Sequence, residues 1–162
     1  MQLKTARLHL NPIQKTDAHF IMELVNSPGW LQYIGDRQVL SIADAEKYIE
    51  KIFSYQAITY LVVYLTAENK PIGIISFMQR TNLDHPDIGF AFLPQYHHKG
   101  YAFEATDYFI RTLKKEKKYN RLEAITIPEN QSSIRLLTKL GLKFDRIIED
   151  ENESLQLFSM TL

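Results

Sequence analysis

The stretch DIGFAFLPQYHHKGYAFEA, residues 87–105, decides how this chain folds. Its first part, 87–93, is mostly apolar and predicts a strand, which Pro94 ends. From residue 101, apolar residues recur at helical spacing and predict a helix over 101–118. A short turn, residues 97–100, joins the two. Because α/β sheets hold ligands just beyond the carboxyl ends of their strands, we expect a ligand at this turn.

The turn has features that suit a phosphate group. Gly100 lacks a Cβ, so the backbone can approach a diphosphate closely, and the helix that follows begins with unpaired N–H groups. His97, His98 and Lys99 add local positive character. The alternative is a glycine that simply begins a helix, which is common. We expect no metal site, because neighbouring histidines rarely direct both rings at one ion and no further ligand lies at a suitable spacing.

The flanking sequence alternates between strand and helix patterns. Further strands are predicted at 6–11, 58–66, 71–80, 121–127, 143–150 and 154–162. Further helices are predicted after Thr16, after Ser41 and over 130–141, with a short helical turn at 30–35. The order is β-α-α-β-β-β-α-β-α-β-β. It predicts an α/β (α+β) fold with a mixed, largely antiparallel central sheet flanked by helices.

Composition narrows the class of protein. The 162 residues suit a single domain, 1–162, and 45% are apolar, enough to close one core. The net charge is zero, so neither nucleic acid nor a membrane surface is an expected partner. The chain has no cysteine, which excludes disulfides and thiolate chemistry. It shows no signal peptide and no membrane-spanning segment, so we expect a cytoplasmic protein.

Two segments of the sequence, in this order along the chain, resemble the GNAT superfamily of N-acetyltransferases. They are residues 87–105 and IPENQSSIRLLTKLGLKF, residues 127–144. Residues 5–18 and 27–37 are also similar to its ribosomal-protein N-terminal acetyltransferase-like (RimJ/RimL-like) branch. The resemblance covers nearly the whole chain and implies a transferase that moves an acetyl group from acetyl-CoA to a primary amine, by direct attack in a ternary complex. It requires no metal.

The resemblance also implies which residues bind acetyl-CoA. The family motif Gln/Arg-x-x-Gly-x-Gly/Ala falls on His97, His98, Lys99, Gly100, Tyr101 and Ala102. His97 replaces the usual Gln or Arg, which should weaken diphosphate binding without abolishing it. His98 stands where the branch usually has glycine, which adds bulk and restricts the turn. Asn130 and Ser133 match positions that contact the pantetheine arm, and the strand segment Phe90, Ala91 and Phe92 offers backbone N–H groups to the carbonyl oxygen.

Acetyl transfer to an amine needs a proton donor for the leaving thiolate and a base for the amine. Many superfamily members protonate the leaving thiolate with a tyrosine at the position of Leu137, so we expect Ser133 to hydrogen-bond the sulfur instead. Asp87 and His85, before or at the start of the central strand, are candidate bases for the amine. The alternatives are solvated loop residues there and deprotonation through water. For Glu104 we expect only a first-turn acid that the helix dipole favours.

The acceptor pocket is expected between the first two predicted helices, where Trp30, Tyr33 and Arg37 form an aromatic wall with one cation. Such a wall suits a small-molecule amine or a peptide N-terminus, although core packing explains Trp30 equally well. Relatives make a homodimer a reasonable expectation. The second hypothesis for function is a catalytically inactive CoA-binding module that acts as a sensor or binds a partner.

Overall fold

The computed structural model describes residues 3–162. Its strands are β1 (Leu3–Lys4), β2 (Leu8–Pro12), β3 (Ile58–Leu65), β4 (Lys70–Met78), β5 (Asp87–Phe92), β6 (Arg121–Thr126), β7 (Lys143–Asp150) and β8 (Glu153–Thr161). Its α-helices are α1 (Ala18–Val25), α2 (Pro28–Tyr33), α3 (Ile42–Ser54), α4 (Tyr101–Glu116) and α5 (Gln131–Lys139). Short 3-10 turns lie at Lys15–Asp17 and Pro94–Tyr96.

The strands form one sheet in the order β1-β2-β3-β4-β5-β6-β8-β7. Every neighbouring pair is antiparallel except β5 and β6, which run parallel. Helix α4 connects the two parallel strands, as a parallel crossover requires. The mixed, largely antiparallel sheet predicted from the sequence is therefore confirmed.

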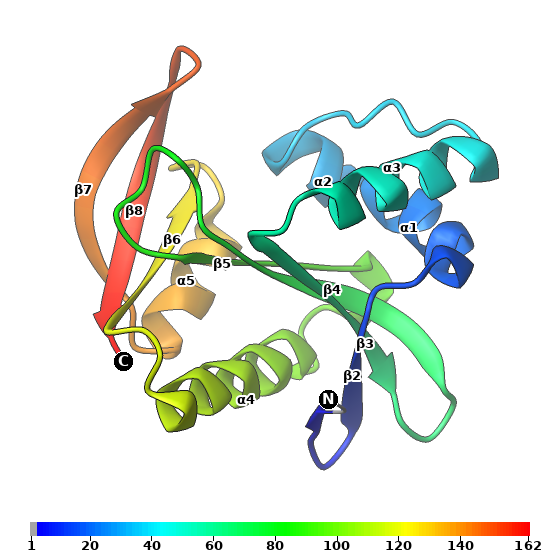
Figure 1. Ribbon diagram of the computed structural model, residues 1–162, viewed down its shortest axis with the longest axis horizontal. Coiled ribbons are helices and arrows are strands. Elements are labelled where there is room, and N and C mark those ends of the chain that lie inside the picture. Colours follow the sequence, from blue (N-terminus) through cyan, green and yellow to red (C-terminus); the bar gives the residue numbers. More distant parts are fainter. Residues whose placement is uncertain (1–2) are drawn as a thin grey trace.

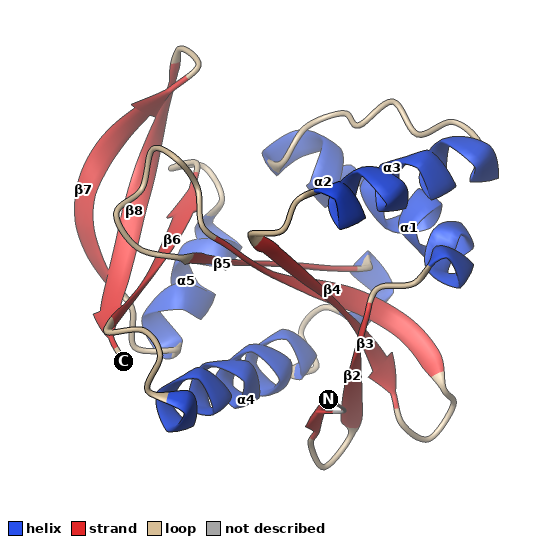
Figure 2. Cartoon of the chain, viewed as in Figure 1, coloured by secondary structure: helices blue, strands red, loops and turns tan. Residues whose placement is uncertain are grey.

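Helices cover both faces of the sheet (Figures 1 and 2). Helices α1, α2 and α3 gather on one side and close a core that includes Leu24, Trp30 and Ile49. Helices α4 and α5 lie on the other side, where Phe109 and Leu137 pack against the sheet. The alternation of side chains along β4 and β5 divides the apolar residues between these two cores.

Local sequence explains where the helices begin and end. Ser41 accepts a hydrogen bond from the Asp44 N–H at 3.1 Å and caps α3. Asn130 caps α5 in the same way, with 3.2 Å between its Oδ1 and the Ser133 nitrogen. Gly141, with φ of +97°, follows α5 in the left-handed conformation that favours glycine. Each of these residues belongs to a type favoured at its position, so the bounds of α3 and α5 follow from local sequence.

The N-terminal part differs in detail from the prediction. The predicted strand 6–11 is β2, shifted to Leu8–Pro12, and Pro12 is its last residue rather than the residue after it. Strand β1 was not predicted, since its two residues carry no periodic signal. The N-cap of α1 is Asp17 instead of Thr16, because the 3-10 turn at Lys15–Asp17 precedes the helix.

Candidate functional site

Strands β5 and β6 separate soon after they begin. Only Asp87 and Glu123 are paired between them, whereas β4 and β5 are paired over six positions. Leu93 donates its N–H to Ile72 O of β4 at 2.9 Å. Because backbone groups alternate along a strand, the N–H and C=O groups of Phe90 and Phe92 face the β6 side, while those of Ala91 face β4. Within residues 3–162 the separation thus leaves backbone donors without partners along the carboxyl half of β5.

The turn between β5 and α4 has two residues in the left-handed region. Gly100, the N-cap of α4, has φ of +80°, and His98 has φ of +60°. For His98 this conformation costs about 1–2 kcal/mol, because its Cβ crowds the carbonyl oxygen. A glycine at this position would avoid that cost. The sequence prediction of a restricted turn therefore has a structural counterpart.

The start of α4 is open to an anion. Gly100 has no side chain to cap the helix, so no side-chain hydrogen bond satisfies its first N–H groups. Lys99 is exposed, with its Nζ 5.9 Å from the centre of the Tyr96 ring. The dipole of a 16-residue helix and the uncapped N–H groups together favour a phosphate at this end.

The two histidines of the turn do not point to a common ion. His97 lies with Nε2 2.9 Å from Phe92 O, so its ring folds back onto β5. The two rings are perpendicular, with centroids 6.3 Å apart. Within residues 3–162 there is no group of three or more histidine, aspartate or glutamate side chains that could hold a metal ion.

Helix α5 follows β6 in the chain, and its N-terminal end carries Asn130 and Ser133. Asn130 is committed to the cap described above, through its Oδ1. The Ser133 side chain is half-buried, and its hydroxyl makes no hydrogen bond within residues 3–162. Leu137, one turn further on, is 1% exposed and belongs to the core. The position of the usual tyrosine acid is therefore an apolar packing position here.

The candidate base Asp87 is buried rather than solvated. It is 2% exposed and forms an ion pair with Arg80, with 2.9 Å between Oδ1 and Nε. Burial raises the pKa of the Asp87 carboxyl above its ordinary value, although the Arg80 guanidinium opposes the shift. Opposite it, Glu123 is 1% exposed and its Oε2 has no partner within the described residues. His85 is half-buried in the preceding loop.

The predicted acceptor residues lie on α2 and the loop after it. Trp30 is 4% exposed and packs in the core beneath α1 and α3, so it is a core residue, with its Nε1 unpartnered within residues 3–162. The Arg37 guanidinium carbon lies 5.9 Å from the centre of the Trp30 ring. Arg37 is exposed, and Tyr33 is half-buried at the end of α2. Trp30 and Arg37 are therefore brought together.

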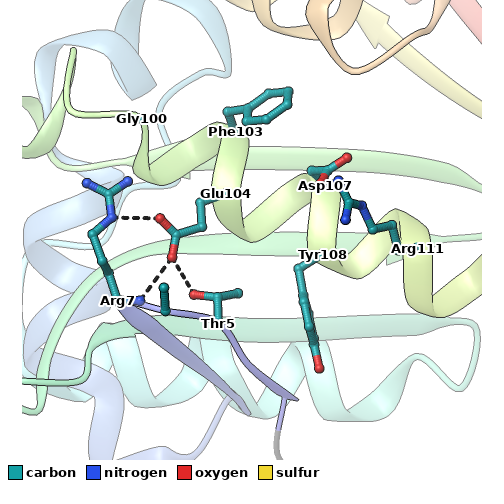
Figure 3. A pocket seen from close by; sticks show the side chains of 9 residues that line it. Thr5, Arg7, Gly100, Phe103, Glu104, Asp107, Tyr108 and Arg111 are labelled. Atoms are coloured by element: carbon teal, nitrogen blue, oxygen red, sulfur yellow. Dashed lines mark hydrogen bonds and ion pairs between the residues drawn. The ribbon is translucent and has the colours of Figure 1, made fainter.

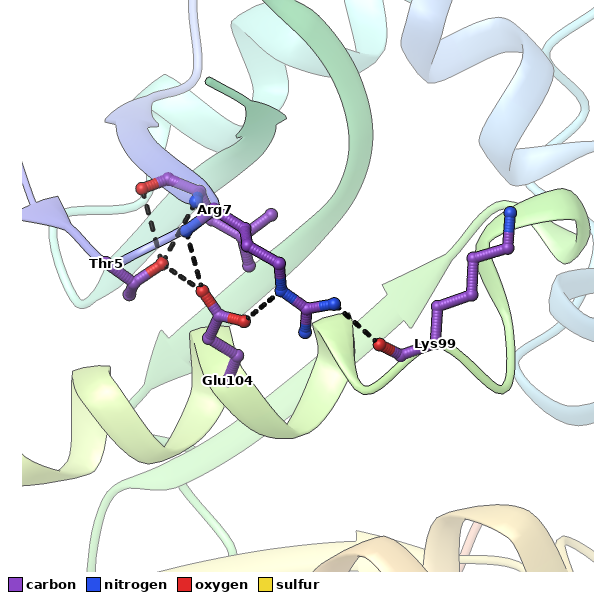
Figure 4. A network of polar contacts seen from close by, with 5 residues as sticks. Thr5, Arg7, Lys99 and Glu104 are labelled. Atoms are coloured by element: carbon purple, nitrogen blue, oxygen red, sulfur yellow. Dashed lines mark hydrogen bonds and ion pairs between the residues drawn. The ribbon is translucent and has the colours of Figure 1, made fainter. Parts of the chain in front are cut away.

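A polar network that was not expected from the sequence joins the N-terminus to the turn (Figure 4). Glu104 accepts hydrogen bonds from Thr5 and from both the backbone and side chain of Arg7. Glu104 is therefore more than a first-turn acid. The same residues line a shallow hollow of about 510 Å³ beside α4, with Asp107 and Arg111 further along the helix (Figure 3). No sequence signal links Arg7 with Glu104, which lie 97 residues apart.

Comparison with known proteins identifies the family. Residues 7–143 match the family model described as the acetyltransferase (GNAT) domain. The chain belongs to the GNAT acetyltransferase family. A Bacillus subtilis protein described as the uncharacterized N-acetyltransferase YnaD is 29% identical over 157 residues, which cover 94% of this chain and 91% of that protein. The family match makes this chain an acetyltransferase.

Solved structures of GNAT proteins have the same fold. A GNAT-family acetyltransferase from Bacillus anthracis superposes with a TM-score of 0.83 at 26% identity, covering 99% of this chain and 98% of that one. The ribosomal L7/L12 α-N-protein acetyltransferase RimL, in complex with coenzyme A, superposes with a TM-score of 0.85 at 13% identity, covering 100% and 98%. At 13% identity the second likeness concerns the fold alone. None of the helices within residues 3–162 is long and apolar enough to cross a membrane.

Proposed function

We propose that this GNAT protein transfers an acetyl group from acetyl-CoA to a primary amine, by direct attack in a ternary complex. The observation that supports acetyl-CoA as the acetyl donor is the combination of an uncapped α4 N-terminus at Gly100 with the separation of β5 from β6. The first suits a diphosphate and the second exposes backbone donors to an extended arm. Coenzyme A bound to the structural neighbour RimL is consistent with this donor.

The residues of the turn fit a diphosphate. At Gly100 a Cβ would lie 3.3 Å from Arg7 Nη2, closer than ordinary van der Waals contact, so the turn is built for a residue without a side chain. The backbone N–H groups from His98 to Ala102 would hold the diphosphate. The His97 ring does not contribute there, because it is bonded to Phe92 O. The main chain rather than the side chains therefore carries the proposed diphosphate binding.

Acetyl-CoA supplies a thioester carbonyl that an amine can attack. Unpaired N–H groups of Phe90 and Phe92 are the proposed donors to the arm and to the carbonyl oxygen. The free hydroxyl of Ser133 is the proposed donor to the leaving sulfur. Since a thiolate is a stable leaving group, a weak donor is sufficient.

The amine must lose a proton before it attacks. Asp87 is the proposed acceptor of that proton, with His85 as the alternative. A carboxyl whose pKa is raised by burial is a better base near neutral pH than an ordinary aspartate. The α-amino group of a protein, with a pKa near ~8, needs less help than a lysine near ~10.4.

The proposed acceptor site is the exposed surface at α2, where Tyr33 and Arg37 lie beside the buried Trp30. Arg37 forms no salt bridge within residues 3–162, so its guanidinium is available to an acceptor carbonyl or carboxylate. A protein N-terminus carries backbone carbonyls, and an amino acid carries a carboxylate. Because the structural neighbour RimL is a ribosomal L7/L12 α-N-protein acetyltransferase, a protein N-terminus is the first acceptor to test.

The test is release of free thiol from acetyl-CoA with a panel of N-terminal peptides and small amines. Thiol release that depends on one acceptor class, with the acetylated amine found by mass spectrometry, supports the proposal. Tight binding of acetyl-CoA without turnover on any acceptor would instead favour the inactive CoA-binding module. No observation in this structure favours that module.

A further inference from the structure

We propose that Arg7 is a positioning residue that orients the diphosphate-binding turn through a brace formed by Thr5, Arg7 and Glu104. The inference rests on the proposed binding of acetyl-CoA at this turn. It assigns a role in cosubstrate binding to a residue of the N-terminal strand region, which lies more than 90 residues from the turn in the sequence.

Glu104 is the centre of the brace (Figure 4). Its Oε1 accepts from Thr5 Oγ1 at 2.5 Å and from the Arg7 N–H at 3.0 Å, and its Oε2 accepts from Arg7 Nε at 2.7 Å. Burial acts to raise the pKa of Glu104, but these hydrogen bonds outweigh it and hold the pKa below its ordinary value. The carboxylate is thus ionised and fixes the Arg7 side chain in one orientation.

Arg7 then reaches past Glu104 to the turn. Its Nη1 donates to the carbonyl oxygen of Lys99 at 3.0 Å, and its guanidinium carbon lies 4.4 Å from the centre of the Tyr101 ring. A planar guanidinium can contact a carboxylate and a carbonyl at once, because its donors point in several directions. The brace therefore connects α4, the segment between β1 and β2, and the turn before α4 through one side chain.

The contact with Lys99 determines where the next N–H points. In a trans peptide the C=O and the following N–H point in opposite directions. With the Lys99 carbonyl turned toward Arg7, the Gly100 N–H is directed away from Arg7, and it makes no hydrogen bond within residues 3–162. That N–H is one of the groups proposed to bind the diphosphate. Arg7 thus sets the direction of a donor without itself needing to touch the ligand.

A positioning role separates the kinetic constants, whereas a merely structural role does not. We expect Arg7→Lys to raise the KM and Kd for acetyl-CoA about tenfold, equivalent to about 1.4 kcal/mol. Lysine keeps the charge but cannot bind both Glu104 and the Lys99 carbonyl in the same geometry. We expect kcat at saturating acetyl-CoA and the KM for the acceptor to stay within about twofold of wild type.

Arg111→Lys is the matched control. Arg111 lies on α4 and lines the same hollow as Arg7 (Figure 3). Its Nη2 forms an ion pair with Asp107 Oδ2 at 2.8 Å, one turn away on the same helix and away from the turn before α4. The control should leave the Kd for acetyl-CoA unchanged. If Arg7→Lys is too unstable to assay, Thr5→Val removes one donor to Glu104, together with the hydroxyl that accepts from the Leu8 N–H at 3.0 Å, and should raise the Kd about threefold.

The measurements are steady-state kinetics and titration calorimetry with acetyl-CoA on the full chain. An unchanged Kd in Arg7→Lys, while wild type binds, would overturn this inference and leave the proposed function standing. A fall in kcat together with a rise in the KM for both acetyl-CoA and the acceptor would also overturn it, because this pattern would indicate general damage to the fold. Failure of the wild type to bind acetyl-CoA would overturn the proposed function together with the brace.

Discussion

Substitution of Gly100 by alanine changes one atom at the proposed diphosphate site. Gly100 has φ of +80°, where an L-residue costs about 1–2 kcal/mol. The new Cβ would lie 3.3 Å from Arg7 Nη2, so the guanidinium has to move and its bond to the Lys99 carbonyl weakens. That half-exposed contact adds about 1 kcal/mol at most. Reduced freedom of the unfolded chain returns about 0.4–1 kcal/mol.

These contributions predict that Gly100→Ala lowers the free energy of unfolding by about 1–2 kcal/mol, which for a domain of this size lowers Tm by roughly 2–8 °C. Displacement of the Arg7 guanidinium would also release the Lys99 carbonyl, whose contact with Arg7 sets the direction of the Gly100 N–H. We therefore expect the Kd for acetyl-CoA to rise at least about tenfold, or about 1.4 kcal/mol. Thermal unfolding and titration calorimetry on the same protein measure the two effects.

Gly29→Ala is the control for a glycine with no such constraint. Gly29 lies in α2 with no atom within 4 Å of the position of a Cβ, and its φ is not in the left-handed region. Alanine there should be neutral or stabilise the helix by up to about 1 kcal/mol, with unchanged binding of acetyl-CoA. The reasoning is refuted if Gly100→Ala binds acetyl-CoA as tightly as Gly29→Ala does.

Four further predictions follow from other positions. His98→Gly should relieve the cost of φ at +60° and raise Tm by up to about 4 °C, and a lower Tm would show that the His98 side chain itself stabilises the turn. Ser133→Ala should lower kcat roughly tenfold or more without changing the Kd for acetyl-CoA, and an unchanged kcat removes its proposed role as a donor to sulfur. Arg37→Glu should raise the KM for the acceptor at least about fivefold, equivalent to about 1 kcal/mol. A change in the KM for acetyl-CoA alone would contradict the proposed role of Arg37 in binding the acceptor. The lowered pKa of Glu104 predicts that its stabilisation is complete above the ordinary value of 4.5 and is lost as pH falls through the folded-state pKa. Thermal unfolding of Glu104→Gln should therefore depend less on pH below about 4.5 than that of wild type, and equal slopes would contradict the assignment.

Features decided by neighbouring residues were predictable from the sequence. The caps at Ser41 and Asn130 and the stop at Gly141 depend on contacts within one helical turn, so a local pattern reveals them. The strand–turn–helix at 87–116 was predictable for the same reason, because its periodicity changes within the segment itself.

Features decided by distant residues were not predictable in this way. The strands β5 and β6 are paired at Asp87 and Glu123 and separate beyond that pair. The whole of helix α4 lies between these two residues in the sequence. Asp87 is buried where β5 lies between β4 and β6, an arrangement that only the folded chain shows. The brace between Arg7 and Glu104 forms only when β2 and the start of α4 meet in the folded chain. Sequence periodicity contains no information on such pairs.

The central claim is that main-chain N–H groups at the start of α4 bind the diphosphate of acetyl-CoA. A crystal structure of the complex with coenzyme A tests it most directly. The account predicts diphosphate oxygens about 2.7–3.2 Å from backbone nitrogens between His98 and Ala102, with the pantetheine arm between β5 and β6. A coenzyme A molecule bound at any other surface, with these N–H groups facing water, would contradict it.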